Sequence, residues 1–87
     1  MASYRVEWKR SAIKELEKLP RQMLARIVEA VNNLTRDPYP SGTHKLSGSG
    51  QTYRIRVGDY RVLYSVYHDK FVVEIIRVKH RKDVYKR

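Results

Sequence analysis

The chain of 87 residues contains no cysteine. Neither a disulfide framework nor a thiolate zinc site can stabilise it, so the fold must rest on packing. No apolar run approaches the roughly 18 residues that a membrane helix needs, and the N-terminal segment lacks the apolar stretch of a signal peptide. Since a chain of this size buries enough surface for one core, we expect a single domain over residues 1–87, cytoplasmic and without a membrane segment.

Acidic residues are also scarce: 9 Asp and Glu stand against 19 Lys and Arg, which gives a formal net charge of +10. Residues 45–87 carry most of the excess, with 11 basic and 4 acidic side chains, whereas residues 1–44 carry 8 and 5. Such a surface attracts polyanions, so nucleic acid, an acidic protein segment and membrane headgroups are the candidate partners. Membrane ranks lowest, because the basic C-terminal stretch has no apolar helical stripe.

Apolar alternation predicts a half-buried strand over residues 3–8. The pattern then changes to helical spacing and predicts a short amphipathic helix before Pro20, because proline cannot continue a helix. Proline suits the first turn of a new helix, so we expect a second helix over residues 20–35. The apolar positions are Ala12, Ile13, Leu16 and Leu19 in the first helix, and Met23, Ile27, Ala30, Val31 and Leu34 in the second.

Glycine, proline and serine gather in residues 37–50, which carry two of the three prolines and three of the four glycines, and this composition predicts a loop. Two alternating stretches, residues 52–57 and 60–67, flank Gly58-Asp59 and predict a β-hairpin. A nearly continuous apolar run over residues 71–78 predicts a last, central strand. The expected architecture is an α+β fold in the order β-α-α-β-β-β, with a mostly antiparallel sheet and a helical hairpin packed on one face.

The predicted hairpin brings arginines together. A two-residue loop places Arg56 directly opposite Arg61, where two like charges repel unless an anion lies between them. Arg54 lies on the same face, and Arg81 follows the last strand. Guanidinium groups that converge on a concave polar surface are suited to bind phosphate. Solvation of an exposed sheet face explains any one of these arginines equally well, but the four together favour an anion site.

Other chemistries find less support. The histidines His44, His68 and His80 lie in a loop, a turn and the basic tail, without the spacing of helical metal ligands, so we expect no metal and no other cofactor. His80 is a candidate for proton transfer, and simple exposure is its alternative. Tyr85 is suited to stack on a base or to pack against the sheet edge. No serine has the histidine and aspartate that nucleophilic catalysis requires.

Four segments, VEWKRSAIKELEKLP, HKLSG, YRIRVGDYRVLYSV and EIIRVKHRKDVY, together resemble the RelE/ParE toxin superfamily, and specifically its RelE-like mRNA interferase branch. The resemblance covers essentially the whole chain in the expected order. It implies the toxin of a type II toxin–antitoxin pair, an endoribonuclease that cleaves mRNA in the ribosomal A site without a metal. A partner antitoxin is expected to block this activity, and DNA is expected as a partner only indirectly, through the antitoxin complex.

The resemblance places the catalytic positions on Arg56, Arg61, Arg81 and Tyr85. The best-understood relative has lysines where this chain has Arg54 and Arg56, and one of those lysines is thought to act as general base. Arginine is a poor base, since its pKa lies above about 12, so we expect Arg56 to clamp the phosphate. Arg81 and His80 remain the candidates to protonate the leaving oxygen. The resemblance also places Ser47 at a position where some relatives carry an extra basic residue. The expected RNA-binding residues are Arg54, Lys45, Lys79, His80 and Lys82.

Two alternatives remain at this point. The ParE-like branch shares the fold but inhibits DNA gyrase by binding it, without cutting RNA, and the basic face of the predicted hairpin argues against this. A non-enzymatic member that only binds its antitoxin and regulates transcription has no positive sequence feature in its favour.

Overall fold

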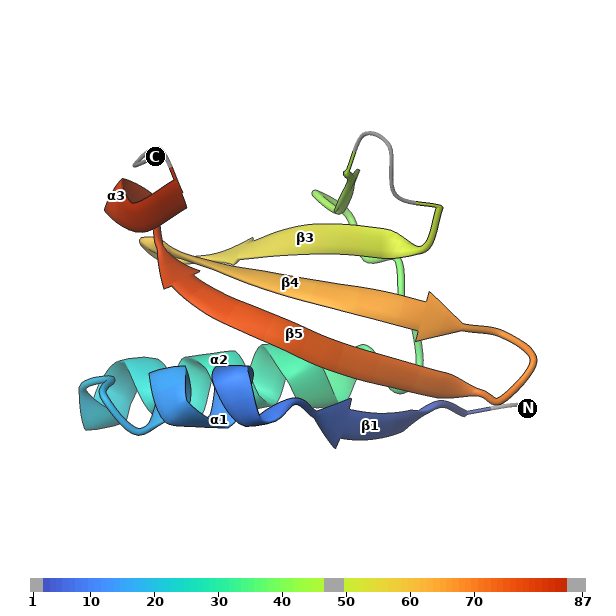
Figure 1. The fold of residues 1–87 in the computed structure, drawn as a ribbon, viewed down its shortest axis with the longest axis horizontal. Coiled ribbons are helices and arrows are strands. Elements are labelled where there is room, and N and C mark those ends of the chain that lie inside the picture. The colour runs from blue at the N-terminus through green and yellow to red at the C-terminus, as the bar shows by residue number, and fades with distance from the viewer. Residues whose placement is uncertain (1–2, 47–49, 85–87) are drawn as a thin grey trace.

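The computed structural model describes residues 3–46 and 50–84, with side chains described as far as Lys82. Along the chain one strand is followed by two helices, then by the other strands of the sheet and a short last helix (Figure 1). The elements are β1 (Arg5–Trp8), α1 (Arg10–Leu16), α2 (Arg21–Asn33), β2 (His44–Lys45), β3 (Thr52–Val57), β4 (Tyr60–Tyr67), β5 (Val72–His80) and α3 (Arg81–Val84).

The strands form one sheet in the order β1-β5-β4-β3-β2. β1 pairs with β5 in parallel, and each of the other neighbouring pairs is antiparallel. Figure 1 shows α1 and α2 together on one side of the sheet and α3 at the end of β5. The predicted α+β fold, with a mostly antiparallel sheet and a helical hairpin on one face, is confirmed. β5 pairs on both sides, as its apolar run predicts.

The core lies between the two helices and the sheet face that they cover. Tyr64 is fully buried there, and its hydroxyl donates a hydrogen bond to the carbonyl of Pro38 at 2.6 Å, which satisfies its polar group. Tyr53 and Tyr60 are partly buried against the same cluster. The other buried residues of the core are Ala12, Ile27, Val31, Leu34, Ile55, Val57, Val62, Val66, Val73, Ile75 and Val78.

Several element boundaries differ from the prediction. Residues 37–50 are not wholly a loop, because β2 lies within them and adds a fifth strand. A two-residue strand has too few positions for any periodicity, so alternation could not reveal it. β5 extends to His80, and the first strand is limited to Arg5–Trp8. α2 begins at Arg21, with Pro20 at the N-cap, and ends at Asn33. Ile13, predicted in the apolar stripe of the first helix, is 43% exposed.

An irregularity in the pairing of β4 with β5 explains why β5 buries two residues that lie three positions apart. Ile75 pairs with Tyr64 and Val78 pairs with Val62, with a register shift between Leu63 and Tyr64. The extra residue in β5 is Ile76, so Ile75 and Val78 both face the core although they lie three positions apart. The same shift places Arg77 and Lys79 on the sheet face opposite the helices, level with Leu63 and Arg61.

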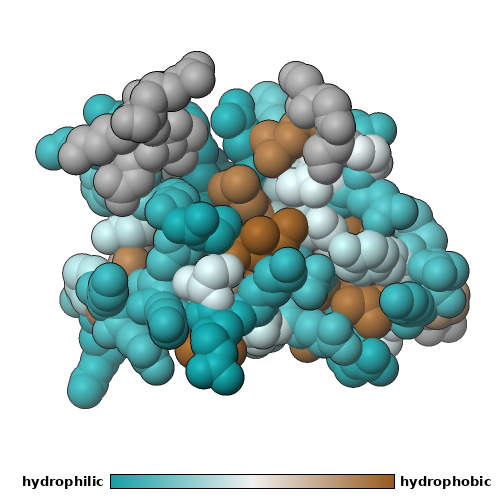
Figure 2. Space-filling model, viewed as in Figure 1, coloured by the Kyte–Doolittle hydropathy of each residue, from teal (hydrophilic) through white to brown (hydrophobic). Residues whose placement is uncertain are grey.

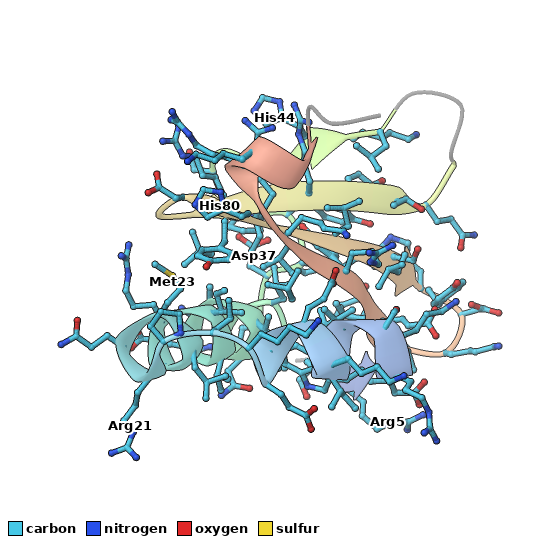
Figure 3. The ribbon with its side chains drawn as sticks, turned by 60° about the vertical axis from the view of Figure 1, so that its left-hand side comes forward. Arg5, Arg21, Met23, Asp37, His44 and His80 are labelled. Carbon is cyan, nitrogen blue, oxygen red and sulfur yellow. The ribbon has the colours of Figure 1, made fainter. Side chains whose placement is uncertain are left out.

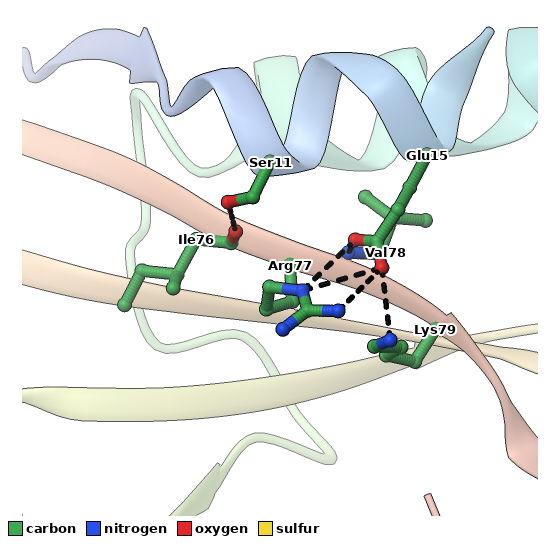
Figure 4. Close-up of polar contacts among 6 residues, drawn as sticks. All are labelled: Ser11, Glu15, Ile76, Arg77, Val78 and Lys79. Carbon is green, nitrogen blue, oxygen red and sulfur yellow. Dashed lines mark hydrogen bonds and ion pairs between the residues drawn. The ribbon is translucent and has the colours of Figure 1, made fainter. Parts of the chain in front are cut away.

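Side chains of α1 bind β5 beyond the end of β1. The last pair of the parallel ladder is Trp8 with Ile75. The next backbone groups of β5 are bound by α1: Ser11 donates to the carbonyl of Ile76 at 2.8 Å, and a carboxylate oxygen of Glu15 accepts the N–H of Val78 at 2.7 Å (Figure 4). α1 therefore continues, through side chains, the hydrogen bonding that β1 begins.

Candidate functional site

The register of the β3–β4 hairpin brings three arginines to one pocket. Arg56 pairs directly with Arg61, as the two-residue loop predicts, and Arg54 pairs with Leu63 on the same face. An open pocket of about 290 Å³ lies here, which we call the arginine pocket. None of the described residues that line it is acidic, so a phosphate bound among them would meet positive and neutral groups. Its lining residues are Gly42, His44, Arg54, Ile55, Arg56 and Arg61.

The tight turn at Gly58 fixes this register. Gly58 has φ +60°, in the left-handed region, and a Cβ there would lie 3.0 Å from the terminal methyl of Met23. Both observations favour glycine at this position. The carbonyl of Gly58 also accepts a hydrogen bond from Nε of Arg56 at 3.0 Å. The turn therefore sets the Arg56–Arg61 pairing and orients one guanidinium group.

β2 adds a residue that the sequence analysis did not assign to the site. His44 pairs with Arg54 across the β2–β3 ladder and lines the arginine pocket. The turn before β2 is closed by two hydrogen bonds from Thr43 to the carbonyl of Pro40, and Gly42 within it has φ +91°. In the sequence, His44 belonged to a stretch without periodicity, so no pattern connected it with the arginines of the hairpin.

Arg81 lies at the same end of the sheet as the hairpin turn. It is the first residue of α3, and its backbone N–H donates to the carbonyl of Asp59 at 2.7 Å. Its side chain is exposed and does not belong to the lining of the arginine pocket. Lys82 follows in α3 and is also exposed, whereas Tyr85 lies outside the described residues.

His80 occupies a different pocket from the arginines. It pairs with Tyr60, whose ring meets the imidazole edge to face at 5.1 Å between centroids. Its Nδ1 accepts the backbone N–H of Lys82 at 3.1 Å. Figure 3 shows His80 nearer the helices and His44 on the far side of the sheet. The structure therefore brings His44, and not His80, to the arginine pocket. His80 lines a pocket of about 270 Å³ with Glu15, Lys18, Leu19, Tyr60, Val78 and Lys79.

Lys79 forms an ion pair that the sequence did not predict. Its Nζ lies 3.1 Å from a carboxylate oxygen of Glu15, and Arg77 binds the same carboxylate at 2.9 Å through its guanidinium group (Figure 4). We call Glu15, Arg77 and Lys79 the Glu15 clamp. Burial alone raises the pKa of Glu15, but the hydrogen bonds from Arg77, Val78 and Lys79 outweigh burial and hold the pKa below its ordinary value. Contact of Lys79 with RNA stays a prediction.

The remaining predicted RNA-binding lysine, Lys45, is exposed in β2 and pairs with Tyr53. The third histidine, His68, lies between β4 and β5. Hydrogen bonds of 2.6 Å join its Nδ1 to the hydroxyl of Tyr4 and its Nε2 to the hydroxyl of Tyr39. His68 is therefore tied to an aromatic cluster at the other end of the hairpin from Gly58.

The surface seen in Figure 2 is mostly hydrophilic, with apolar residues gathered in small patches between polar ones. Within residues 3–46 and 50–84, no group of three or more His, Cys, Asp or Glu side chains is arranged to hold a metal ion. In the same part of the chain no helix is long and apolar enough to cross a membrane.

The fold agrees with comparisons to known proteins. Residues 6–85 match the family model of the ParE toxin of type II toxin–antitoxin systems. The chain belongs to this family of small toxins.

Individual relatives place the chain in the RelE-like branch. Toxin RelG of Mycobacterium tuberculosis is 38% identical over 97% of this chain and 98% of its own length. The archaeal RelE of the RelE–RelB complex from Pyrococcus horikoshii has a TM-score of 0.82 at 37% identity, over 91% of this chain and 96% of that one. The RelBE2 complex of M. tuberculosis contains a chain with a TM-score of 0.81 at 34% identity, over 92% of this chain and 100% of that one.

Proposed function

We propose that this RelE-type toxin is a metal-independent endoribonuclease that cleaves mRNA in the ribosomal A site and thereby stops translation. The observation that carries the proposal is the arginine pocket, in which Arg54, Arg56 and Arg61 line one open hollow without an acidic neighbour among the described lining residues. A pocket of this kind is suited to a phosphodiester, and its position on an open sheet face gives an extended strand access.

The reaction proposed is attack of a ribose 2′-hydroxyl on the adjacent phosphate. The protein must align the 2′-oxygen, the phosphorus and the leaving 5′-oxygen, and it must neutralise the charge that develops on the phosphorane. Arg56 and Arg61 are proposed to perform both tasks, and their pairing across β3 and β4 at the same pocket supports this. Arg54 adds a contact to the RNA backbone.

Arg81 and Tyr85 complete the proposed machinery. The hydrogen bond from Arg81 to Asp59 holds the start of α3 against the hairpin turn, next to the residues that position Arg56 and Arg61. From there the Arg81 side chain is proposed to stabilise the departing 5′-oxygen. Tyr85 is proposed to stack on a base, and Lys45, Lys79, His80 and Lys82 to add affinity for RNA.

The antitoxin is proposed to be a RelB-like protein, since relatives crystallised as RelE–RelB and RelBE2 complexes. The net charge of +10 calls for a partner segment with negative charge. We expect the affinity of the complex to fall as salt rises, because screening weakens charge attraction. Titration calorimetry at low and high ionic strength measures this, and an affinity that does not change would show that electrostatics is not the main attraction.

Purified toxin and ribosomes programmed with a defined mRNA test the activity. We expect cleavage within the A site in the presence of EDTA. An mRNA with a 2′-deoxy nucleotide before the cut should bind but stay intact, because the nucleophile is missing. Cleavage of the deoxy substrate would exclude the 2′-hydroxyl mechanism. Intact mRNA, together with DNA breaks when the toxin is expressed, would favour inhibition of gyrase instead.

A further inference from the structure

The three arginines of the arginine pocket cannot accept the proton that the proposed reaction releases. Arg54, Arg56 and Arg61 are donors only, because the guanidinium group carries five N–H groups, no acceptor, and a proton that it does not release in proteins. The proposed cleavage begins with a 2′-hydroxyl that must lose its proton. Positive charge stabilises the phosphorane, but it cannot accept that proton. The pocket therefore needs one side chain with a free lone pair and an ordinary pKa near neutrality.

His44 is the described side chain that fits this need. It lines the arginine pocket and is the direct cross-strand partner of Arg54, so their Cβ atoms lie about 5 Å apart. Imidazole is the side chain whose ordinary pKa lies nearest to neutral pH. The other two histidines are held elsewhere: His80 lines the pocket with Tyr60, and His68 bonds two tyrosines.

We propose that His44 is the general base of the cleavage reaction. This inference rests on the proposed function. The neutral imidazole takes the proton of the 2′-hydroxyl as the bond from the 2′-oxygen to phosphorus forms and the bond from phosphorus to the 5′-oxygen breaks. The leaving 5′-oxygen takes a proton from water, and His44 returns its own proton to the hydroxide so formed. The products are a 2′,3′-cyclic phosphate and a 5′-hydroxyl.

The local architecture supports a catalytic side chain at this position. His44 is exposed, so a substrate can reach it, while its backbone is fixed by the β2–β3 ladder and by the bond from Leu46 N–H to the Thr52 carbonyl. The charged groups that face it are Arg54 and Arg56 from β3 and Arg61 from β4, with Lys45 beside it in β2. These are all cations that stay protonated across neutral pH. His44 is thus the described lining residue of this pocket whose side chain can accept a proton through a ring nitrogen.

Single-turnover cleavage of ribosome-bound mRNA by His44→Ala tests the role. General bases contribute about 100- to 10,000-fold, so we expect a loss of that size while binding to ribosomes carrying the 2′-deoxy mRNA stays unchanged. The wild-type rate should rise with pH between about 5 and 8, because only neutral imidazole accepts a proton, and this rise should vanish in the variant. Free imidazole in the buffer should restore part of the activity of His44→Ala.

His68→Ala is the matched control, since it removes an exposed histidine far from the pocket. It should cleave at the wild-type rate and gain nothing from imidazole. Thermal unfolding checks that both variants fold. A His44→Ala protein that cleaves at the wild-type rate, or that loses activity without changing the pH profile and without rescue, overturns the assignment. A wild-type protein that leaves the mRNA intact overturns the proposed function itself, and the base assignment with it.

Discussion

Two groups of basic side chains on one sheet face differ in what they bind. Arg61 of the arginine pocket pairs directly with Lys79 of the Glu15 clamp, so the two regions meet on neighbouring strands. Lys79 and Arg77 are neutralised by the Glu15 carboxylate at 3.1 and 2.9 Å, whereas Nε of Arg56 binds the uncharged carbonyl of Gly58. The clamp holds a helix to a strand, whereas the pocket is proposed to bind phosphate. A carboxylate thus binds the basic side chains of the clamp, whereas none lies among the described residues that line the pocket.

The largest effect should come from removing charge from the proposed active site, which includes the arginine pocket and Arg81. We expect Arg61→Ala and Arg81→Ala to lower single-turnover cleavage about 100- to 1,000-fold, about 2.7–4 kcal/mol of transition-state stabilisation, because each removes a donor aimed at developing charge. Thermal unfolding should stay close to wild type. Arg5→Ala, an exposed arginine of β1 that pairs with Glu7, is the control and should cleave normally. Normal activity of Arg61→Ala would remove the arginine pocket as the active site.

The main expected effect of Glu15→Ala is a lower free energy of unfolding. It removes the acceptor of the Val78 N–H and the ion pairs of Arg77 and Lys79, at a cost of about 1–3 kcal/mol in the free energy of unfolding. Urea unfolding at neutral pH measures the cost, with Glu17→Ala, on the exposed side of the same helical stretch, as the control. A stable Glu15→Ala protein would show that the clamp adds nothing to the attachment of α1.

Gly58→Ala tests the turn that builds the pocket. The left-handed φ of +60° costs an alanine about 1–2 kcal/mol, and its Cβ also approaches Met23. Gly50→Ala should be close to neutral, because nothing lies within 4 Å of the position that its Cβ would take. Equal unfolding midpoints for the two variants would contradict the strained turn.

The smallest effect is the pH dependence of the clamp. The pKa of Glu15 is lowered in the folded protein from its ordinary value of 4.5, so its contribution is present above that value and is lost as pH falls through the lowered one. The stability difference between wild type and Glu15→Gln should therefore be greatest near neutral pH and should shrink below about pH 4.5. Unfolding curves at several pH values measure it. A difference that grows in acid would mean that the folded state raises the pKa of Glu15.

Sequence periodicity predicted the parts of the molecule that are governed by local rules. The Gly58-Asp59 turn fixes the pairing of Arg56 with Arg61, because a two-residue loop determines which residues lie opposite each other. The helical stripe around Ile27 and Val31 is buried as its spacing predicts. Both features depend on residues close together in the chain.

The missed features depend on contacts between distant residues. Glu15 and Lys79 meet only because α1 packs along β5, and no spacing relates positions 64 residues apart. β2 owes its existence to pairing with β3, so His44 could be connected with Arg54 only after the strands were in place. Because Ile76 is an extra residue in β5, Lys79 and His80 each lie on the sheet face opposite to the one that simple alternation would give them. His80 therefore lies apart from the arginines of the pocket.

The hydrogen bonds from α1 to β5 beyond the end of β1 also affect the tendency of the protein to aggregate. β5 is the longest strand, nine residues, and much of it is apolar, yet β4, β1 and the side chains of Ser11 and Glu15 bind its backbone from both sides. The strands that end the sheet are short instead, four residues in β1 and two in β2, and they carry charged side chains that discourage pairing with another molecule. Detachment of α1 would leave backbone groups of β5 unpaired and able to pair with another molecule, so the helix covers a strand edge in addition to stabilising the fold.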